Sequence, residues 1–130
     1  MSEQVICRGE VLTDGGEGVR FEFTPKVRLG GTAVALEPVQ AFAIRYRGTV
    51  HAYQNRCGHV PVELDWQPGE FFDQSGLYLI CATHGAIYAP ESGRCLGGRC
   101  NGKGLQPLRV VERDGWVIFI GEGETGGTGG

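Results

Sequence analysis

The chain has 130 residues, of which 41% are hydrophobic and 21% charged, the balance of a soluble globular protein with one domain. The formal net charge of −3 gives no basic face for nucleic acid, and no apolar run approaches the roughly 20 residues that span a membrane. The first ten residues, MSEQVICRGE, lack the basic and apolar segments of a signal peptide, so we expect a cytoplasmic protein.

The cysteine and glycine counts narrow the class further. Five cysteines are an odd number, which argues against a scaffold held by disulfides alone. Glycine supplies 23 residues, and outside the C-terminal end these mark the many turns of an all-β domain. We therefore expect one domain over residues 1–120 and a flexible glycine-rich tail over residues 121–130.

Hydrophobic alternation predicts the strands of the N-terminal part. Residues 3–7 are expected to form a first short strand, and residues 19–23 alternate between apolar and charged side chains, as a half-buried strand does. Residues 26–38 contain two adjacent glycines and a proline, and we expect a loop there with one strand at residues 33–36.

Two hairpins are predicted in the remainder of the chain. Residues 42–46 and 50–54 alternate on either side of Arg47-Gly48, and this hairpin leads directly to Cys57. Residues 108–111 and 116–120 flank Asp114-Gly115, a strong turn signal. Short strands are also expected at 77–80 and 86–88, and a glycine-rich loop at 97–102.

Four candidate metal ligands lie between the two hairpins. Cys57 and His59 form a C-x-H pair, and Cys81 and His84 form a C-x-x-H pair. Thiolate and imidazole together suit either a zinc ion or a [2Fe–2S] cluster with two histidine ligands. Zinc sites more often group like ligands together, whereas here each short loop carries one of each kind, which favours two irons over one zinc.

The pattern C-x-H … C-x-x-H-G resembles the Rieske family motif, and Gly85 and Tyr88 extend the match. The resemblance covers residues from about 19 to 120. It implies an all-β Rieske (ISP-like) fold of stacked antiparallel sheets, with an inserted cluster-binding subdomain over about residues 55–102.

The resemblance also implies the cofactor and the role of each ligand. Cys57 and Cys81 would bind one iron of a Rieske-type [2Fe–2S] cluster, and His59 and His84 would bind the other. In the family the histidine-bound iron is the one reduced, and its imidazoles lie near the surface. Tyr88 matches a tyrosine whose hydroxyl can donate to a cluster-ligand sulfur. No catalytic residue is implied, because such a protein carries electrons and is not expected to act as an enzyme alone.

Several positions depart from high-potential members of the family. Ala86 stands where those proteins have a serine that donates to a cluster sulfur, and Val62 and Thr83 stand where they have a disulfide across the cluster. Fewer donors disfavour the more negative reduced state, so we expect a potential near the low end of the Rieske range of about −150 to +300 mV. The gap between His59 and Cys81 is longer than usual, and the loop at 97–102 lacks the family's proline.

The remaining candidate residues receive structural roles. Cys95 and Cys100 could form a disulfide or offer a spare ligand, but in a reducing compartment they are expected to be free thiols. Trp116 is expected in the core, and His51 on a strand surface. The acidic residues of the segment between the two loops are expected to be solvated: Glu63, Asp65, Glu70 and Asp73.

These features lead to a functional prediction. The resemblance implies a soluble ferredoxin that takes one electron from a reductase and passes it to a terminal oxygenase. One alternative is a small Rieske subunit of a larger oxidoreductase, similar to that of assimilatory nitrite reductase, and another is a redox sensor. The expected partners are therefore redox proteins, with no nucleic acid and no membrane. A catalytic oxygenase subunit would need a second domain for its 2-His-1-carboxylate iron site.

Overall fold

A computed structural model describes residues 3–56, 63–65, 67, 69–81, 85–98 and 103–122. These residues form β-strands joined by turns and loops, with a single 3-10 turn at Gly9–Val11. Within the described ranges, no helix is long and apolar enough to cross a membrane. The predicted all-β class is confirmed.

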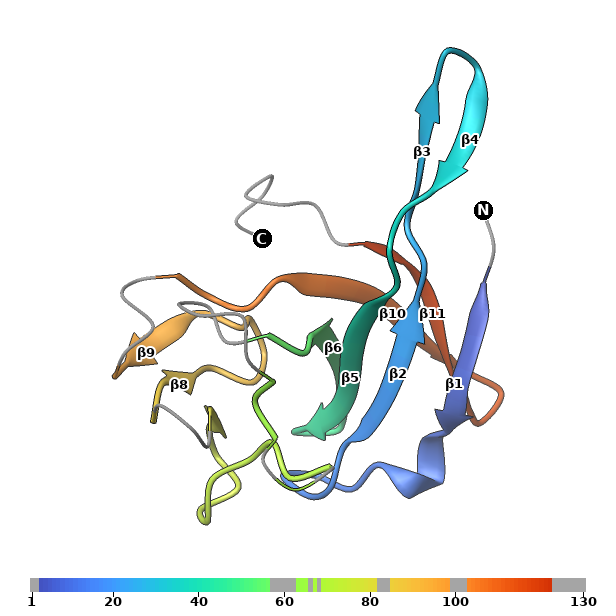
Figure 1. The fold of residues 1–130 in the computed structure, drawn as a ribbon. Coiled ribbons are helices and arrows are strands. Elements are labelled where there is room, and N and C mark those ends of the chain that lie inside the picture. Colours follow the sequence, from blue (N-terminus) through green and yellow to red (C-terminus); the bar gives the residue numbers. More distant parts are fainter. Residues whose placement is uncertain are drawn as a thin grey trace.

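The main sheet contains six antiparallel strands in the order β1-β11-β10-β6-β5-β2 (Figure 1). Their bounds are β1 Gln4–Arg8, β2 Val19–Phe23, β5 Val39–Tyr46, β6 Thr49–Gln54, β10 Pro107–Arg113 and β11 Trp116–Glu122. The sheet curls until its two edge strands approach each other, and the Gln4 side-chain amide donates a 2.8 Å hydrogen bond to the Glu22 carbonyl. Strand β11 ends two residues inside the segment predicted as a tail, and the rest of that segment lies outside the described residues.

Both predicted hairpins of the main sheet are confirmed. Arg47 and Gly48 have φ values of 50° and 83°, and Asp114 and Gly115 have φ values of 53° and 80°. Two consecutive positive φ values are typical of the type I′ turn, whose twist matches that of the flanking strands. The β5–β6 hairpin therefore delivers the chain to Cys57 from a rigid support.

Strand β5 is buried on both faces. The sequence alternation predicted one apolar face, carrying Phe42 and Ile44, but Ala41 and Ala43 are also inaccessible to solvent. Each pair belongs to a different core. The core inside the curled sheet contains Leu12, Phe23, Ala41, Ala43, Ala52, Leu108, Val117 and Phe119. The second core lies against the other face of β5, where a smaller sheet covers it.

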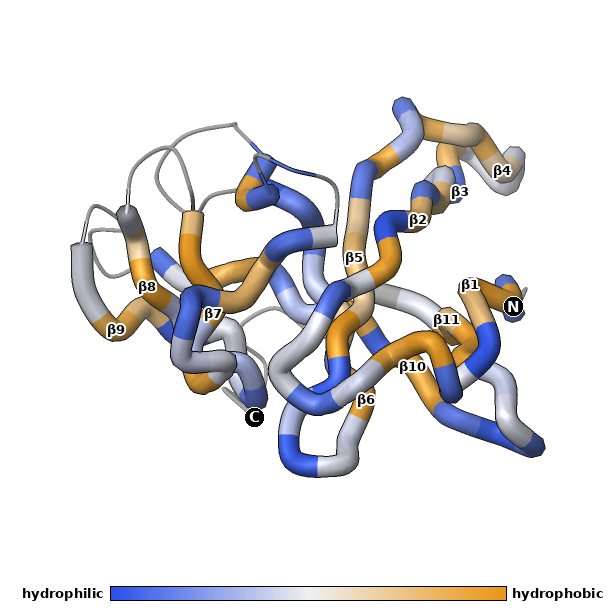
Figure 2. Tube along the Cα trace, turned by 90° about the horizontal axis from the view of Figure 1, so that it is seen from below, coloured by the Kyte–Doolittle hydropathy of each residue, from blue (hydrophilic) through white to orange (hydrophobic). Residues whose placement is uncertain are grey.

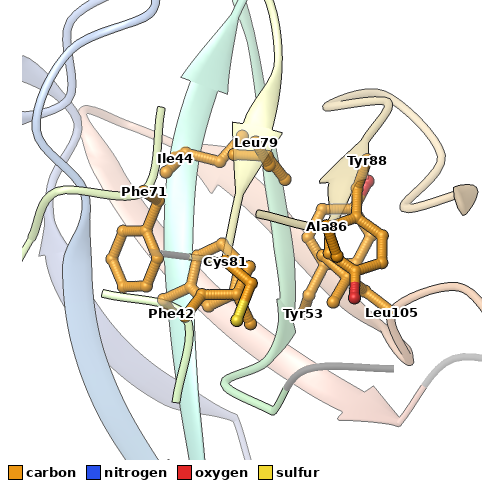
Figure 3. Close-up of a cluster of buried hydrophobic side chains, with 10 residues drawn as sticks. Phe42, Ile44, Tyr53, Phe71, Leu79, Cys81, Ala86, Tyr88 and Leu105 are labelled. Carbon is orange, nitrogen blue, oxygen red and sulfur yellow. The ribbon is translucent and has the colours of Figure 1, made fainter. Parts of the chain in front are cut away.

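The smaller sheet contains three short antiparallel strands, β7 Leu79–Ile80, β8 Ile87–Tyr88 and β9 Cys95–Gly97. β7 is shorter than the predicted strand at 77–80, and β9 was not predicted from the sequence. The side chains that join this sheet to β5 and β6 include Phe42, Ile44, Tyr53, Leu79, Ala86, Tyr88 and Leu105 (Figure 3). The Tyr53 hydroxyl donates a buried 2.6 Å bond to the Pro90 carbonyl, which ties the two sheets together.

A separate hairpin, β3 Lys26–Leu29 and β4 Thr32–Ala35, projects from the main sheet (Figure 1). The predicted strand at 33–36 corresponds to β4, but the loop predicted before it was wrong: residues 26–29 form β3, and Gly30 and Gly31, with positive φ values, connect the two paired strands. Every residue of both strands is exposed, including Leu29 at 61%. In the hydropathy colouring, apolar and polar positions are mixed along this arm (Figure 2).

The prediction that Trp116 lies in the core was also wrong. Trp116 is the first residue of β11 and points away from the core that holds its neighbour Val117, so it is 40% exposed. The guanidinium of Arg8, on the paired strand, lies 4.8 Å from the centroid of the indole. The tryptophan therefore makes a surface cation–π contact.

Arg45 joins the N-terminal turn to two strands of the main sheet. Its guanidinium donates to the carbonyls of Gly9, Leu12 and Gly48, and both of its Nη atoms contact the Glu112 carboxylate, at 2.6 and 3.0 Å. A lysine at this position has a single ammonium group and can make only some of the hydrogen bonds that the planar guanidinium makes.

Replacing Arg45 with lysine should therefore lower the free energy of unfolding by about 1–3 kcal/mol in urea titrations, because buried carbonyls lose their donors. The matched control is Arg113→Lys, since the Arg113–Glu3 pair is half exposed on both sides. That change should cost less than about 0.5 kcal/mol. Equal losses in the two variants would contradict the assigned role of Arg45.

Candidate metal centre

The structure describes part of the predicted site. Cys81 and Tyr88 lie within the described residues, on either side of the second ligand loop. Cys57, His59 and His84 fall outside them, as do Val62 and Thr83. The geometry therefore comes from the residues that carry the two loops, and the complete ligand set stays a prediction.

The ends of the second ligand loop are joined by backbone hydrogen bonds. The Cys81 amide donates to the Ala86 carbonyl at 2.9 Å, and the Gly85 amide donates to the Cys81 carbonyl at 2.7 Å. Gly85 has a φ of 71°, a left-handed conformation that glycine adopts at no steric cost. The chain therefore reverses tightly between β7 and β8, as a rigid ligand loop requires.

Cys81 is fully buried in the second core. Figure 3 shows its sulfur beside Phe42, with Tyr53 and Ala86 farther along the same cluster. A thiolate in apolar surroundings is costly unless it is neutralised, and coordination to a metal supplies that neutralisation. Ala86 is also buried and offers no side-chain donor. Tyr88 is buried beside them, on β8.

The first ligand loop begins at Asn55, directly after β6. The Asn55 amide donates to the Gln40 carbonyl of β5 at 2.8 Å, which holds the start of the loop to the main sheet. The Asn55 side chain reaches the far end of the loop: its Oδ1 accepts from the Leu64 amide at 2.9 Å, and its Nδ2 donates to Asp65 Oδ1 at 2.9 Å. One side chain thus connects the residues on both sides of Cys57 and His59.

Asp65 lies at the centre of a buried polar network. Arg20 of β2 donates to both carboxylate oxygens, at 2.7 and 2.8 Å, and the Gly69 amide donates to Oδ2 at 2.9 Å. The expectation that Asp65 is solvated was wrong: only 3% of the residue is exposed.

The charge state of Asp65 follows from these contacts. Burial acts to raise the pKa of the carboxyl, but the hydrogen bonds from Arg20, Asn55 and Gly69 outweigh it and hold the pKa below its ordinary 3.8. A lowered folded-state pKa contributes stability above the ordinary value, and that stability is lost as the pH falls through the folded value. The network is therefore intact at neutral pH.

The segment between the two loops forms part of the second core. The Phe71 ring stacks on Phe42 with their centroids 3.9 Å apart, and Leu64 is fully buried. The Phe71 carbonyl accepts from the Ile80 amide at 2.9 Å, which fixes the segment to β7. Described residues between His59 and Cys81 therefore contribute apolar packing to the second core.

The glycine-rich loop begins against the second ligand loop. A Cβ atom on Gly98 would lie 2.7 Å from the Gly85 carbonyl oxygen and 2.9 Å from Ala86 Cα, so only glycine fits. Residues 99–102 lie outside the described ranges. Cys95, on β9, is disulfide-bonded, which contradicts the expected free thiol; Cys100 is not described.

Comparison with known proteins identifies the class. A family model described as the Rieske [2Fe-2S] domain matches residues 5–112. The match spans most of the chain, so the protein belongs to the Rieske [2Fe–2S] family, and its cofactor is a [2Fe–2S] cluster of the Rieske type. A search of curated proteins returned no match.

Solved structures agree on the fold. The ferredoxin of carbazole 1,9a-dioxygenase from Nocardioides aromaticivorans IC177 matches with a TM-score of 0.63 and 15% identity, covering 94% of this chain and 100% of that one. The Sphingomonas yanoikuyae B1 ferredoxin matches with a TM-score of 0.62 and 19% identity over the same shares. The terminal oxygenase of carbazole 1,9a-dioxygenase from Novosphingobium sp. KA1 matches with a TM-score of 0.64 and 19% identity, but only over 30% of its length. The predicted Rieske fold is confirmed.

Proposed function

We propose that this protein is a Rieske ferredoxin that carries one electron from a reductase to a terminal oxygenase. The observation that carries the proposal is the end-to-end correspondence with ferredoxins. The structural match covers 94% of this chain and the whole of the Nocardioides ferredoxin, whereas it covers only 30% of the Novosphingobium oxygenase. The expected cytoplasmic location belongs to the same proposal.

The proposed ligands divide by chemistry. Cys57 and Cys81 would hold one iron as thiolates, and His59 and His84 the other as neutral imidazoles. When bound, the cluster supplies reversible one-electron chemistry. The described part of the site fits this donor set, because Cys81 is buried at the start of a tight loop and Gly85 reverses the chain directly after His84.

The surroundings of Cys81 support a low potential. Ala86 is buried in the same cluster and its methyl group cannot donate a hydrogen bond to a cluster sulfur. Tyr88 is the remaining candidate donor in the sequence. We therefore propose a midpoint potential near the low end of the Rieske range, and a value above roughly +100 mV in voltammetry would contradict it.

The ligand set is tested by EPR of the dithionite-reduced protein. We expect a rhombic signal whose average g value lies below that of all-cysteine [2Fe–2S] ferredoxins. His84→Cys should shift or abolish this signal because it removes one of the two imidazoles. The third histidine provides the control: His51 lies on β6, where burial lowers its pKa, and His51→Gln should leave the signal unchanged. A stoichiometric zinc content with no paramagnetic cluster would overturn the proposal.

The projecting hairpin favours a second candidate, a small Rieske subunit held permanently in a larger oxidoreductase. Val27 and Val34 pair across this hairpin, and both remain exposed together with Leu29. An isolated two-stranded hairpin is marginally stable in water, so a permanent partner would stabilise it. Sedimentation of the protein purified from its native source distinguishes a free ferredoxin from a permanent subunit. A ferredoxin should sediment alone, and a subunit should remain in a stoichiometric complex.

A further inference from the structure

We infer that Asn55, Asp65 and Arg20 are positioning residues that hold the first ligand loop in its metal-binding form. The inference rests on the proposed ligands Cys57 and His59, which lie between Asn55 and Asp65 in the sequence. None of the three residues is assigned to bind iron itself. They act on the loop through its two ends.

The first step is the closure of the loop by the Asn55 side chain. Its carbonyl oxygen accepts from Leu64 N–H and its NH₂ donates to Asp65, so one amide satisfies both groups in a single orientation. Among the residues that the structure describes, these are the bonds that join the two ends of the first loop. The second loop differs, because backbone bonds between residue 81 and residues 85 and 86 join its ends.

The second step is the anchoring of that amide by Asp65. The carboxylate is buried, and each of its oxygens accepts two hydrogen bonds: Oδ1 from Arg20 and Asn55, and Oδ2 from Arg20 and Gly69. A buried carboxylate bound in this way has little freedom to rotate, and charge-assisted bonds to arginine are the strong ones. Asp65 therefore fixes the Asn55 amide in its bridging orientation.

The third step is the connection to the main sheet. Arg20 belongs to β2, which pairs with β5, and Asn55 N–H is bound to Gln40 of β5. The far end of the loop is thus tied to β2 and its near end to β5. The described residues at both ends of the loop are therefore held by strands of the main sheet. Preorganisation of this kind is what an outer-sphere partner of a metal ligand provides.

A second carboxylate in contact with Arg20, that of Glu63, provides a matched control. Arg20 Nη2 contacts the Glu63 carboxylate at 3.1 Å, and both side chains are more than a third exposed at that contact. Glu63→Gln and Asp65→Asn each remove one carboxylate from the same arginine. Only the second change replaces one of the two carboxylate oxygens that Arg20, Asn55 and Gly69 share with an NH₂ group, which cannot accept a hydrogen bond. A positioning role predicts different outcomes for the two variants, and general loss of charge predicts similar ones.

The experiment measures cluster release from the holoprotein into an iron chelator at neutral pH, followed by visible absorption. Asp65→Asn and Asn55→Ala should each release the cluster about tenfold faster or more, because a buried hydrogen-bonded partner is lost. Glu63→Gln should stay within about twofold of the wild type. The two fast variants should also broaden the EPR signal, and amide hydrogen exchange should increase at Leu64 relative to Val117 in the sheet.

A further control separates positioning from general destabilisation. Arg45→Lys lowers global stability from the far end of the sheet, so it should unfold more easily and yet keep its cluster at the wild-type rate. The two variants are compared under conditions where their free energies of unfolding are equal. If Arg45→Lys then releases the cluster as fast as Asp65→Asn, the positioning role is wrong. If Asp65→Asn fails to fold, Asn55→Ala alone decides, because it removes the bridge and leaves the Arg20–Asp65 pair intact. A wild-type rate in Asn55→Ala would overturn the inference.

Failure of the positioning inference can be distinguished from failure of the proposed ligand set. If the wild-type protein shows no Rieske EPR signal, the proposed function fails before any variant is compared. If the wild type shows that signal and the Asp65 and Asn55 variants release the cluster no faster than Glu63→Gln, only the positioning inference fails. The double variant should be no faster than the faster single variant, because both changes break one network.

Discussion

Cys81→Ser is expected to give a folded protein that has lost its cluster. Cys81 begins the second ligand loop and is fully buried. Serine is close in size to cysteine, but its hydroxyl is a poor ligand for iron in place of a soft thiolate. The purified variant should be colourless, and its iron and sulfide contents should fall to near zero.

The fold of this variant should survive. The hydroxyl replaces a sulfur in an apolar cluster, which costs about 1–3 kcal/mol when no partner is gained. That loss is smaller than the stability of an ordinary domain, about 5–15 kcal/mol, so the circular dichroism spectrum should remain that of a β-protein. A variant that loses both its iron and its β-structure would not separate ligation from folding, and Cys81→Ala would then replace it.

Cys7→Ser is the matched control for this experiment. Cys7 lies on β1, half-buried against the core of the curled sheet, and burial raises the pKa of its thiol despite the opposing effect of Arg45. It therefore stays a neutral thiol and has no role in the proposed site. The Cys7 variant should keep the full iron content. A full iron content in Cys81→Ser would remove Cys81 from the ligand set.

Gly98→Ala is expected to have the second large effect, although Gly98 is not one of the proposed ligands. Its φ of 80° costs roughly 1–2 kcal/mol for a residue with a side chain. The added Cβ would also lie 2.7 Å from the Gly85 carbonyl oxygen and 2.9 Å from Ala86 Cα. The neighbours are backbone atoms of the second ligand loop, so the loop must move. We expect a reduced cluster content, faster release to a chelator and a lower Tm.

Gly97→Ala is the control for this change. Gly97 ends β9, its φ is not in the left-handed region, and among the residues that the structure describes a Cβ there would meet no atom within 4 Å. The two variants add the same methyl group to adjacent residues, so composition and helix or strand propensity are matched. Gly97→Ala should keep the cluster and the Tm of the wild type. Equal behaviour of the two variants would contradict the contact between the glycine-rich loop and the second ligand loop.

Local patterns made much of the fold predictable. Hydrophobic alternation identified β2, and turn residues with positive φ identified the hairpins around Arg47-Gly48 and Asp114-Gly115. These signals are local because a hairpin turn and its flanking strands lie close together in the sequence. The spacing of cysteine and histidine predicted the Rieske family, which the family model confirms.

Contacts between residues that are distant in the sequence were harder to predict. Arg20 and Asp65 are 45 positions apart, and nothing in the residues around Asp65 distinguishes a buried carboxylate from a solvated one. The available sequence signal for this contact was the alternation of residues 19–23, which placed Arg20 on the face opposite Phe21. A charged side chain that lies against buried residues needs a partner. The burial of Trp116 was misjudged for the same reason, because it depends on which face of β11 the curled sheet covers.

The pairing of β1 with β11 has a consequence for the order of folding. Gln4 lies opposite Phe119, so the main sheet acquires its β1 edge only when nearly the whole chain is available. The β5–β6 hairpin and both ligand loops precede β10 and β11 in the sequence. During synthesis, cysteines and histidines would therefore emerge before the sheet that supports them is complete. Such distant pairing folds slowly, so the cysteine thiols are open to solvent and to oxidants for an interval before the sheet closes.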